Sequence, residues 1–472
     1  MAIEFLSQSD LTSLKNEINS LFNRLYPLCR SILGQGYRDS LDILREYVPF
    51  ELEYFKSGVQ VLNWKIPKEW VIEEAYIENE NHEKIIDFKN NNLHVVNYSS
   101  PIDAVLSLES LKAHIYTSST SDIAIPYTLS YYKERWGFCM SKKQLDSLPD
   151  GNYHVCIQSK FVDGALVIGQ TVLEGESKKE ILLSSYLCHP SMANNELSGP
   201  LVLAMLYHRI KNWKNRKYTY RFVINPETIG SIAYLSAHGD ELKNSLHAGL
   251  VLTCLGGNVD SLRIKHSRLG TAPFDRLVRR INSFNLDNYN TSEQSAAFSE
   301  FYKSIEIAGK FRTIDFLPNE GSDERQYCSA GFNLPVSQIS RLSYGTYKEY
   351  HTSLDNKELM GIDTIIDSAN RIEALLKLEE MEVYYENLYP YGEVKLGDYD
   401  LYPSLNSSGA KSSENDLLIN DPDFVRKVMY ILSFSDGKTP LSEIAVKLNS
   451  NEHQLEIVSK ILVEKGLLKE AL

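Results

Sequence analysis

YLCHPSMANNELSG, residues 186–199, is the stretch of sequence that decides the fold of this chain. Residues 181–187 form a short apolar run with the length of a buried strand, and from 197 to 213 apolar residues recur at helical spacing. A strand, a short polar loop and a helix therefore follow one another. Ligands in open α/β sheets bind beyond the carboxyl ends of the strands, where His189 would lie. A neutral imidazole is a natural zinc ligand, so the stretch predicts a metal site at the edge of a sheet.

The surrounding sequence predicts an α/β fold whose mostly parallel sheet is sandwiched by helices. Strand patterns and helical patterns alternate between residues 151 and 388, as expected for strands joined by crossover helices. Strands are expected at 153–159, 181–187, 218–224, 249–255 and 334–339, and helices at 197–213, 230–238, 274–284 and 361–381.

Composition along the chain predicts further parts. Residues 1–60 and 117–388 are expected to form the α/β domain, and 61–116 have the short alternating segments and turns of a small inserted β-rich domain. Residues 389–417 are rich in Gly, Pro and Ser, which is typical of a linker. Three helical patterns in 418–472, at 424–432, 441–448 and 453–465, followed by a turn, predict a winged helix-turn-helix.

Overall composition is that of a soluble globular protein. The chain has 472 residues, 43% of them hydrophobic and 24% charged, which suffices for two or three domains. No apolar run reaches the roughly 18 residues of a membrane span, and the first residues lack the pattern of a signal peptide. Six scattered cysteines suit a reducing compartment. We therefore expect a cytoplasmic protein that does not contact a membrane.

Charge argues against nucleic acid as a partner. The net charge is −13, and from Asp421 onward seven basic residues are opposed by eight acidic ones. A winged helix that reads nucleic acid should present a basic face. A protein contact or a dimer through the C-terminal module is therefore the favoured interpretation, and a DNA-linked regulator is the weaker one.

Residues with ligand chemistry follow other probable strands in the same way as His189. Glu227 comes after the strand at 218–224, and Cys254 lies at the end of the strand at 249–255. Asp323 and His351 stand in two later loops. Because the carboxyl ends of parallel strands meet at one edge of a sheet, these side chains are expected to lie close together.

Each of these residues also has a structural interpretation. A histidine can be a satisfied core or loop residue, Glu227 can cap the helix that follows it, and Cys254 can be a buried thiol. Asp323 can be a turn or cap residue, and Asn195 can hold its loop by hydrogen bonds. The metal interpretation is favoured for the histidines and Glu227 because they occur together in one constellation.

The order of these motifs resembles the zinc aminopeptidase superfamily that includes glutaminyl cyclases. It is especially similar to a bacterial group of aminopeptidase-like proteins associated with polysaccharide biosynthesis, which carry an inserted β domain and a C-terminal winged helix. The similar segments, which make the resemblance nearly chain-wide, are Leu28-Cys-Arg-Ser-Ile-Leu-Gly-Gln-Gly36, Leu93-His-Val-Val-Asn-Tyr-Ser99, Gly321-Ser-Asp-Glu-Arg-Gln-Tyr327 and Glu349-Tyr-His-Thr-Ser353.

The resemblance implies a role for four residues. His189 matches the first zinc ligand of the superfamily and His351 the last. Glu227 matches the acidic pair that supplies a metal ligand and the general base. Asp323 matches an acidic residue that orients the site beside the metal.

Three residues depart from the superfamily pattern. Asn195 stands where the superfamily has an aspartate that bridges two zinc ions, Pro226 stands in place of the first glutamate of the pair, and Cys254 lies near a further aspartate ligand. Two Zn²⁺ ions about 3.5–4 Å apart repel each other by roughly 17–19 kcal/mol at an effective dielectric constant near 20. A neutral amide does not offset that repulsion. We therefore expect one zinc ion, held by His189 or His351 with Glu227 or Cys254, and at most a weak oxygen ligand from Asn195.

The expected function is that of a zinc-dependent aminopeptidase-like hydrolase acting on a small aminoacyl or peptidyl amide, in polysaccharide or natural-product biosynthesis. Glu227, if it is not a ligand, would serve as the general base. The planar guanidinium of Arg325 suits a substrate carboxylate, and Tyr350 is a further candidate substrate contact. The alternative is a catalytically degenerate aminopeptidase fold that acts as a binding or regulatory protein.

Overall fold

The computed structural model describes residues 10–131, 133–284, 296–402 and 423–471. The chain divides into two compact units, Met1–Leu376 and Lys377–Leu472. Residues 403–417 of the expected linker lie outside the described residues, as do 418–422 and 472 of the expected C-terminal domain and 1–9 of the α/β domain.

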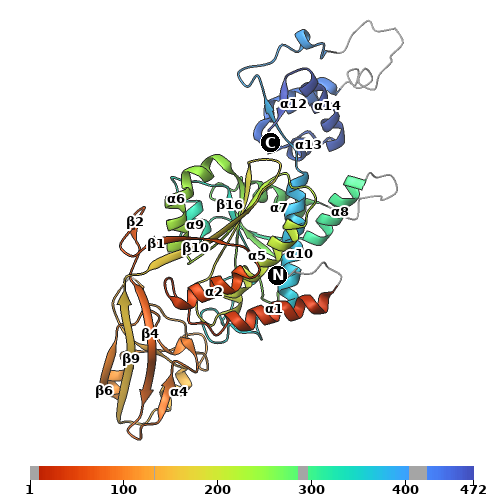
Figure 1. The fold of residues 1–472 in the computed structure, drawn as a ribbon. Helices are drawn as coiled ribbons and strands as arrows, with labels where there is room; N and C mark the ends of the chain where they lie inside the picture. The colour runs from red at the N-terminus through yellow and green to blue at the C-terminus, as the bar shows by residue number, and fades with distance from the viewer. Residues whose placement is uncertain (1–9, 132, 285–295, 403–422, 472) are drawn as a thin grey trace. The chain divides into compact units, whose positions relative to one another are not determined.

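An eight-stranded sheet forms the centre of the first unit (Figure 1). Its order is β1-β10-β12-β11-β13-β16-β14-β15, and the four neighbours β12, β11, β13 and β16 run parallel. The mostly parallel sheet is therefore confirmed, with antiparallel strands toward both edges. The strands are β1 (Glu51–Lys56), β10 (Ala165–Leu173), β11 (Glu180–Tyr186), β12 (Thr219–Asn225), β13 (Leu246–Leu252), β14 (Arg263–Lys265), β15 (Arg312–Ile314) and β16 (Val336–Ser340).

Helices lie on both sides of this sheet (Figure 1). Helix α5 connects β11 to β12, and α6 connects β12 to β13. Because β12 and β13 flank β11 on opposite sides, right-handed crossovers place α5 and α6 on opposite faces. The helices of the unit are α1 (Leu11–Leu25), α2 (Gln35–Arg45), α3 (Leu108–Lys112), α4 (Lys142–Asp146), α5 (Ser198–Lys211), α6 (Ile229–Ser245), α7 (Pro273–Ser283), α8 (Ala296–Ala308), α9 (Glu324–Tyr327) and α10 (Ile362–Met381), which runs on into the second unit.

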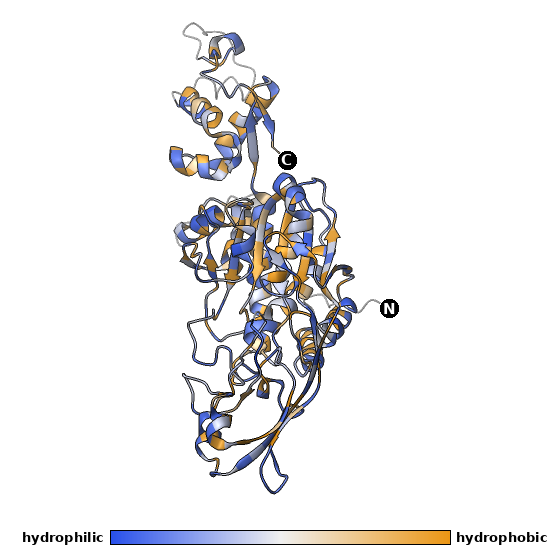
Figure 2. Cartoon of the chain, turned by 90° about the vertical axis from the view of Figure 1, so that its left-hand side faces the viewer, coloured by the Kyte–Doolittle hydropathy of each residue, from blue (hydrophilic) through white to orange (hydrophobic). Residues whose placement is uncertain are grey.

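The core of this unit lies against the central parallel strands. Every residue of β11 and β12 is buried. Strands covered on both faces have continuous apolar runs rather than alternating ones. Figure 2 shows the hydrophobic colouring concentrated in the strands of this sheet. The sequence located β11 and β12 within one residue because such runs are read locally, whereas the strand expected at 249–255 lies three residues earlier, at β13.

A second sheet of four strands is antiparallel throughout, in the order β5-β4-β9-β6. Its strands are β4 (Glu69–Glu78), β5 (Lys84–Asp87), β6 (Ile102–Ser107) and β9 (Asn152–Val162). The expected range of 61–116 for the insert omits β9, which pairs with both β4 and β6. Residues 153–159, expected in the parallel sheet, thus form a strand of this smaller sheet. Periodicity identifies a strand but not its partners, which explains the difference.

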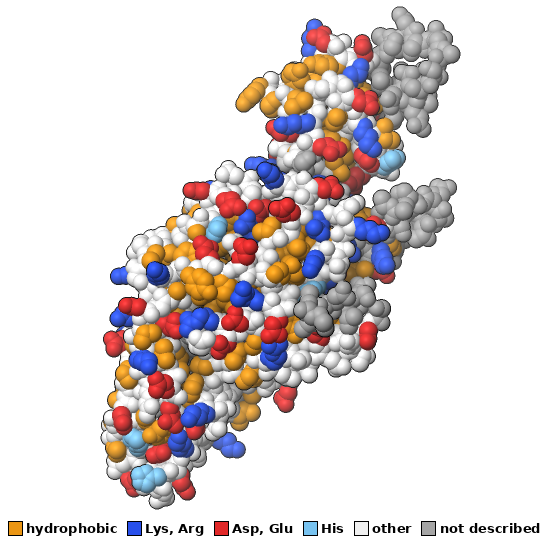
Figure 3. All heavy atoms as spheres, in the orientation of Figure 1, with side chains coloured by type: hydrophobic (Ala, Val, Ile, Leu, Met, Phe, Trp, Pro, Cys, Tyr) orange, Lys and Arg blue, Asp and Glu red, His pale blue; other side chains and the backbone are white. Residues whose placement is uncertain are grey.

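The second unit is a winged helix-turn-helix, as predicted. Helix α13 (Leu441–Leu448) and helix α14 (Glu452–Glu464) form the helix-turn-helix, and α12 (Phe424–Phe434) precedes them. The three-stranded sheet has the order β18-β17-β19, with β17 (Tyr384–Asn387), β18 (Asp436–Pro440) and β19 (Leu468–Glu470). Acidic and basic side chains are interspersed on the face seen in Figure 3.

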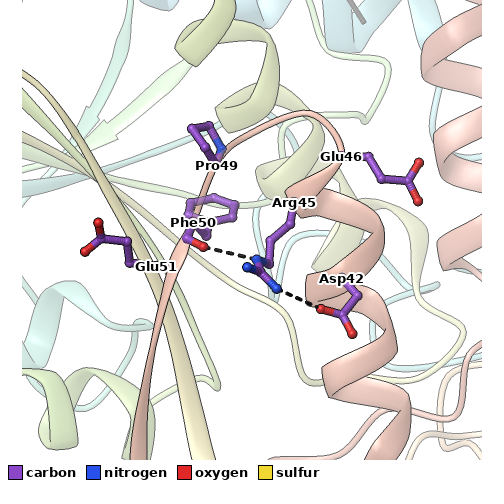
Figure 4. A pocket seen from close by; sticks show the side chains of 6 residues that line it. All are labelled: Asp42, Arg45, Glu46, Pro49, Phe50 and Glu51. Carbon is purple, nitrogen blue, oxygen red and sulfur yellow. Dashed lines mark hydrogen bonds and ion pairs between the residues drawn. The ribbon is translucent and has the colours of Figure 1, made fainter. Parts of the chain in front are cut away.

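A surface hollow of about 520 Å³ lies between the end of α2 and the start of β1 (Figure 4). Its lining residues are Asp42, Arg45, Glu46, Pro49, Phe50 and Glu51. Arg45 points across it and donates hydrogen bonds to the Phe50 carbonyl and the Asp42 carboxylate. None of the predicted site residues lines this hollow, so the candidate site lies elsewhere.

None of the described helices has the length and apolar composition needed to cross a membrane.

Candidate metal centre

Three predicted residues, His189, Glu227 and His351, come together. His189 follows β11 and Glu227 follows β12, which are neighbouring parallel strands. The Nε2 atom of His189 is 3.6 Å from Oε2 of Glu227, and the rings of His189 and His351 have centroids 5.2 Å apart. The Nε2 atom of His351 is buried and has no hydrogen-bond partner. Two imidazoles and a carboxylate are donors that zinc accepts, so the donor types suit the metal. The trio is not among the groups of described residues whose ligand atoms all lie within 4.8 Å of one another.

The other ring nitrogen of His189 faces Cys188, which the sequence did not indicate, and Glu196, which the sequence offered only as a substitute carboxylate one residue past Asn195. Its Nδ1 atom is 2.7 Å from Oε2 of Glu196 and 3.5 Å from Sγ of Cys188. Among the described residues, Cys188, His189 and Glu196 form a buried group whose ligand atoms lie within 4.8 Å of one another, close enough to hold a metal ion. The two ring nitrogens of His189 therefore face different possible ligands. Nε2 faces Glu227, and Nδ1 faces Cys188 and Glu196.

Access from solvent distinguishes the two sides of His189. The side chains of His189 and Glu196 are 5% and 0% exposed, whereas that of Glu227 is 25% exposed. Arg325 and Tyr350 are half-buried. A substrate can thus approach the Nε2 side, while the Nδ1 side is closed. The 2.7 Å separation at Nδ1 is an ion-pair distance, although Oε2 of Glu196 has no hydrogen-bond partner, and it leaves Nε2 on the side of Glu227.

Charges around the two histidines push their pKa values in opposite directions. Burial acts to lower the pKa of His189, but Cys188 and Glu196 outweigh it and raise that pKa well above its ordinary value. Burial, with a smaller contribution from His189, lowers the pKa of His351. His351 is therefore neutral, which is the form that binds metal. Burial also raises the pKa of Glu227.

Backbone strain is concentrated around the site. Ser191, Thr228, Cys254 and His351 have φ between +49° and +64°. Thr228 is the most strained, because a β-branched side chain crowds this conformation. With ψ at −71° and a hydrogen bond from the Ile229 N–H to the Glu227 carbonyl, it centres a γ-turn of the rare positive-φ type. Strain of this kind is found at functional sites, where the surrounding structure holds it.

Asp323 supports the turn that carries Glu227 rather than facing the histidines. Its carboxylate accepts hydrogen bonds from the Thr228 N–H at 2.7 Å, the Ser231 hydroxyl at 3.0 Å and the Asn225 amide at 2.8 Å. Burial, and next the charge of Glu227, raise the pKa of Asp323 to about 7. The Ser322 hydroxyl donates to Oε1 of Glu227 at 2.7 Å. The Gly321–Tyr327 segment therefore positions Glu227, because Asp323 binds the turn after it and Ser322 binds its carboxylate.

Asn195 and Cys254 lie in contact with each other. The Oδ1 atom of Asn195 accepts hydrogen bonds from the Tyr186 hydroxyl at 2.7 Å and the Cys254 thiol at 3.4 Å. Burial raises the pKa of Cys254 to about 12, so the thiol stays protonated. The predicted ligand oxygen of Asn195 is thus already occupied by two donors. These contacts agree with the structural interpretation of Asn195, in which its side chain holds its loop by hydrogen bonds.

The two candidate substrate contacts occupy the open side. Tyr350 stacks on His351 with ring centroids 3.9 Å apart. Arg325 donates to the Ser322 carbonyl at 3.3 Å, and its charge is a small influence against the rise that burial causes in the pKa of Glu227. Both lie near the histidines or Glu227, and their contact with a substrate stays a prediction.

Several residues that shape the site were missed as such in the sequence. The ring of Tyr127 lies 5.0 Å from that of His189 and 5.2 Å from that of His351. Asp355 accepts hydrogen bonds from the backbone N–H groups of Asn194 and Asn195. Glu196 stands within the stretch 186–199, one residue past Asn195, but only its contact with His189 places it at the site. Nothing in the sequence marks Tyr127.

Comparison with known proteins identifies relatives over the whole chain. A *Clostridium acetobutylicum* protein named "Putative polysaccharide biosynthesis protein with aminopeptidase-like domain" is 38% identical over 455 residues, which cover 96% of each chain. The crystal structure of a "putative peptidase" from *C. acetobutylicum* has a TM-score of 0.73 and 35% identity, covering 97% of both chains.

More distant structures share the fold alone. The zinc aminopeptidase BSAP of *Bacillus subtilis* has a TM-score of 0.50 at 10% identity, covering 76% of this chain and 94% of its own. A peptidase M28 precursor of *Shewanella amazonensis* has a TM-score of 0.52 at 10% identity, covering 78% and 92%. The α/β unit is therefore aminopeptidase-like in fold.

Family models cover nearly the whole chain. Residues 19–304 and 296–382 match the domain of unknown function DUF4910, and residues 383–470 match a winged helix-turn-helix. The chain belongs to the DUF4910 family, as an aminopeptidase-like protein with a C-terminal winged helix-turn-helix.

Proposed function

We propose that this protein is a zinc-dependent hydrolase of the aminopeptidase type that binds one zinc ion per chain. The observation that carries the proposal is the meeting of His189, Glu227 and His351, in which Nε2 of His189 lies 3.6 Å from the Glu227 carboxylate and Nε2 of His351 has no hydrogen-bond partner. These three residues would hold the ion. Zinc at this place would polarise the scissile carbonyl and lower the pKa of a bound water.

The substrate that we infer is a small aminoacyl or peptidyl amide. Arg325 offers a planar fork for a carboxylate, and the Tyr350 ring offers a flat surface beside His351. The name of the *C. acetobutylicum* relative supports an amide on a sugar intermediate of polysaccharide biosynthesis. Glu227 is held by Ser322 through Oε1, which leaves Oε2 to bind the metal or to accept a proton.

Two measurements test this proposal. Elemental analysis of zinc-loaded protein should find close to one zinc per chain, and hydrolysis of a panel of aminoacyl amides should fall about 10²–10⁴-fold in Glu227→Gln. Glu358→Gln, an exposed change, is the matched control and should retain full activity. A protein that takes up no zinc would refute the proposal.

A metal held on the other side of His189 is the alternative geometry. Cys188 and Glu196 would then be ligands together with Nδ1. Cobalt(II) in place of zinc would give an intense sulfur-to-metal charge-transfer band in that case, because a thiolate would be bound. We expect no such band, and the same spectrum in Cys188→Ser.

Binding without hydrolysis is the second candidate function. Asn195 favours it, because its neutral amide stands where the superfamily has a charged bridge and is held by Tyr186 and Cys254. Zinc uptake without turnover of any amide in the panel would select this function. For the C-terminal unit we propose a protein contact or a dimer, since its acidic and basic residues are balanced.

A further inference from the structure

The guanidinium of Arg30 is completely buried directly behind His189. Its Nε atom donates to the backbone carbonyl of His189 at 2.9 Å, and Nη1 donates to the carbonyl of Leu25 at the end of α1. Its Nη2 atom is buried without a hydrogen-bond partner. A guanidinium keeps its charge in a protein, so a buried one requires a compensating anion.

Glu196 is the carboxylate that compensates this charge. Its side chain is fully buried and its Oε2 atom lies 2.7 Å from Nδ1 of His189, while neither carboxylate oxygen has a hydrogen-bond partner. Burial lowers the pKa of Arg30, and the charge of Glu196 is the strongest influence opposing that change. Arg30 donates a hydrogen bond to the main chain of His189, and Glu196 lies at ion-pair distance from its ring.

The segment around Arg30 is itself tied to the loop that carries His189. The Asn97 amide donates to the Arg30 carbonyl at 3.0 Å. The Asn92 amide donates to the Pro27 carbonyl at 2.8 Å and to the Ser191 hydroxyl at 3.1 Å. Segments 28–36 and 93–99, together with the adjoining Pro27 and Asn92, therefore support the loop that carries His189. Both segments contribute to the family resemblance, and the sequence assigned neither of them a catalytic or ligand residue.

We propose that Arg30 is a positioning residue for the metal centre. It fixes the backbone of His189 through the hydrogen bond to its carbonyl, and so holds the ring with Nδ1 beside Glu196 and Nε2 toward Glu227. The inference rests on the zinc site proposed above. Partners that orient a ligating histidine typically change metal affinity 10–100-fold when they are removed.

The test compares two buried arginines in the full-length protein. Arg30→Met should weaken zinc binding about 10–100-fold, measured by competition with a chromophoric chelator. Arg221→Met is the matched control, because Arg221 is also buried but pairs with Glu180 toward the other end of the strands. It should lower the melting temperature and leave zinc affinity within about threefold of the wild-type value. The visible spectrum of the cobalt(II) protein should change in Arg30→Met and not in the control.

Arg30→Lys provides the second variant if Arg30→Met does not fold. Lysine keeps the charge but cannot direct two N–H groups at different carbonyls, so zinc affinity should fall by less and the cobalt spectrum should still change. Wild-type affinity and an unchanged spectrum in Arg30→Lys or Arg30→Met would overturn this inference while leaving the zinc proposal intact. An equal loss in Arg221→Met would also overturn it. Wild-type protein that binds no zinc would overturn both.

Discussion

The C-terminal helix-turn-helix and the loops around His189 are fixed by contacts of different range. In the former, α13 occupies the predicted residues, and Asn451 caps α14 by accepting a hydrogen bond from the His453 N–H at 2.9 Å. His189 instead depends on Arg30, Glu196 and His351, which lie up to 162 positions away in the sequence. Local contacts give a well-defined module, whereas long-range contacts can hold strained residues together. The second arrangement is the one that suits a reactive centre.

Removing one histidine tests this difference most strongly. His351→Ala should lower zinc affinity by more than about 100-fold, because it removes a ligand rather than one of the partners that orient it. Competition with a chromophoric chelator measures the loss. His114→Ala, which removes a ring stacked on Trp136, is the control and should bind zinc normally. Unchanged affinity in His351→Ala would exclude His351 as a ligand.

A core substitution in the C-terminal unit should lower stability and leave zinc affinity unchanged. Leu455 is fully buried in α14, and Leu455→Ala should cost about 2–5 kcal/mol of the stability of that unit. Urea unfolding followed by circular dichroism would show this loss as an earlier transition. Zinc affinity should stay within about threefold of the wild-type value. A parallel fall in zinc affinity would mean that the two regions are energetically coupled.

The sequence predicted most of the fold because most elements carry a local signal. The apolar runs of β11 and β12 and the helical spacing of α5 and α13 are complete within a few residues. The partners of β9 are not encoded locally, so its place in the smaller sheet was missed. Of the site, the strand-end rule placed His189 and Glu227 together. The contacts of Arg30 and Tyr127 depend on how distant loops pack, which no spacing reveals, and that of Glu196 depends on the conformation of its own loop.

A substitution at Asn195 tests whether this residue, which departs from the superfamily pattern, stabilises the fold rather than binding the metal. Asn195→Ala should cost about 1–3 kcal/mol, since it leaves the buried Tyr186 hydroxyl and Cys254 thiol with fewer partners. Thermal unfolding measures the cost, and Tyr186→Phe, which removes one of the two donors, should cost less. Zinc affinity should change less than about threefold in Asn195→Ala. A larger loss would show that the amide oxygen is a ligand after all.

The smallest expected effect is a change in stability on replacing one positive-φ residue in each region. Thr228 has φ +64° at the turn that directs Glu227, and Asn449 has φ +50° at the end of α13. Asparagine adopts the left-handed conformation readily, but a β-branched residue is strained there. Thr228→Gly should therefore stabilise the protein by up to about 1 kcal/mol, whereas Asn449→Gly should change stability by less than about 0.5 kcal/mol. Differential scanning calorimetry measures both. If Thr228→Gly gave no gain, the turn would not be storing strain. If it raised stability and also weakened zinc binding, then the strain at Thr228 helps to hold the Glu227 carboxylate toward His189.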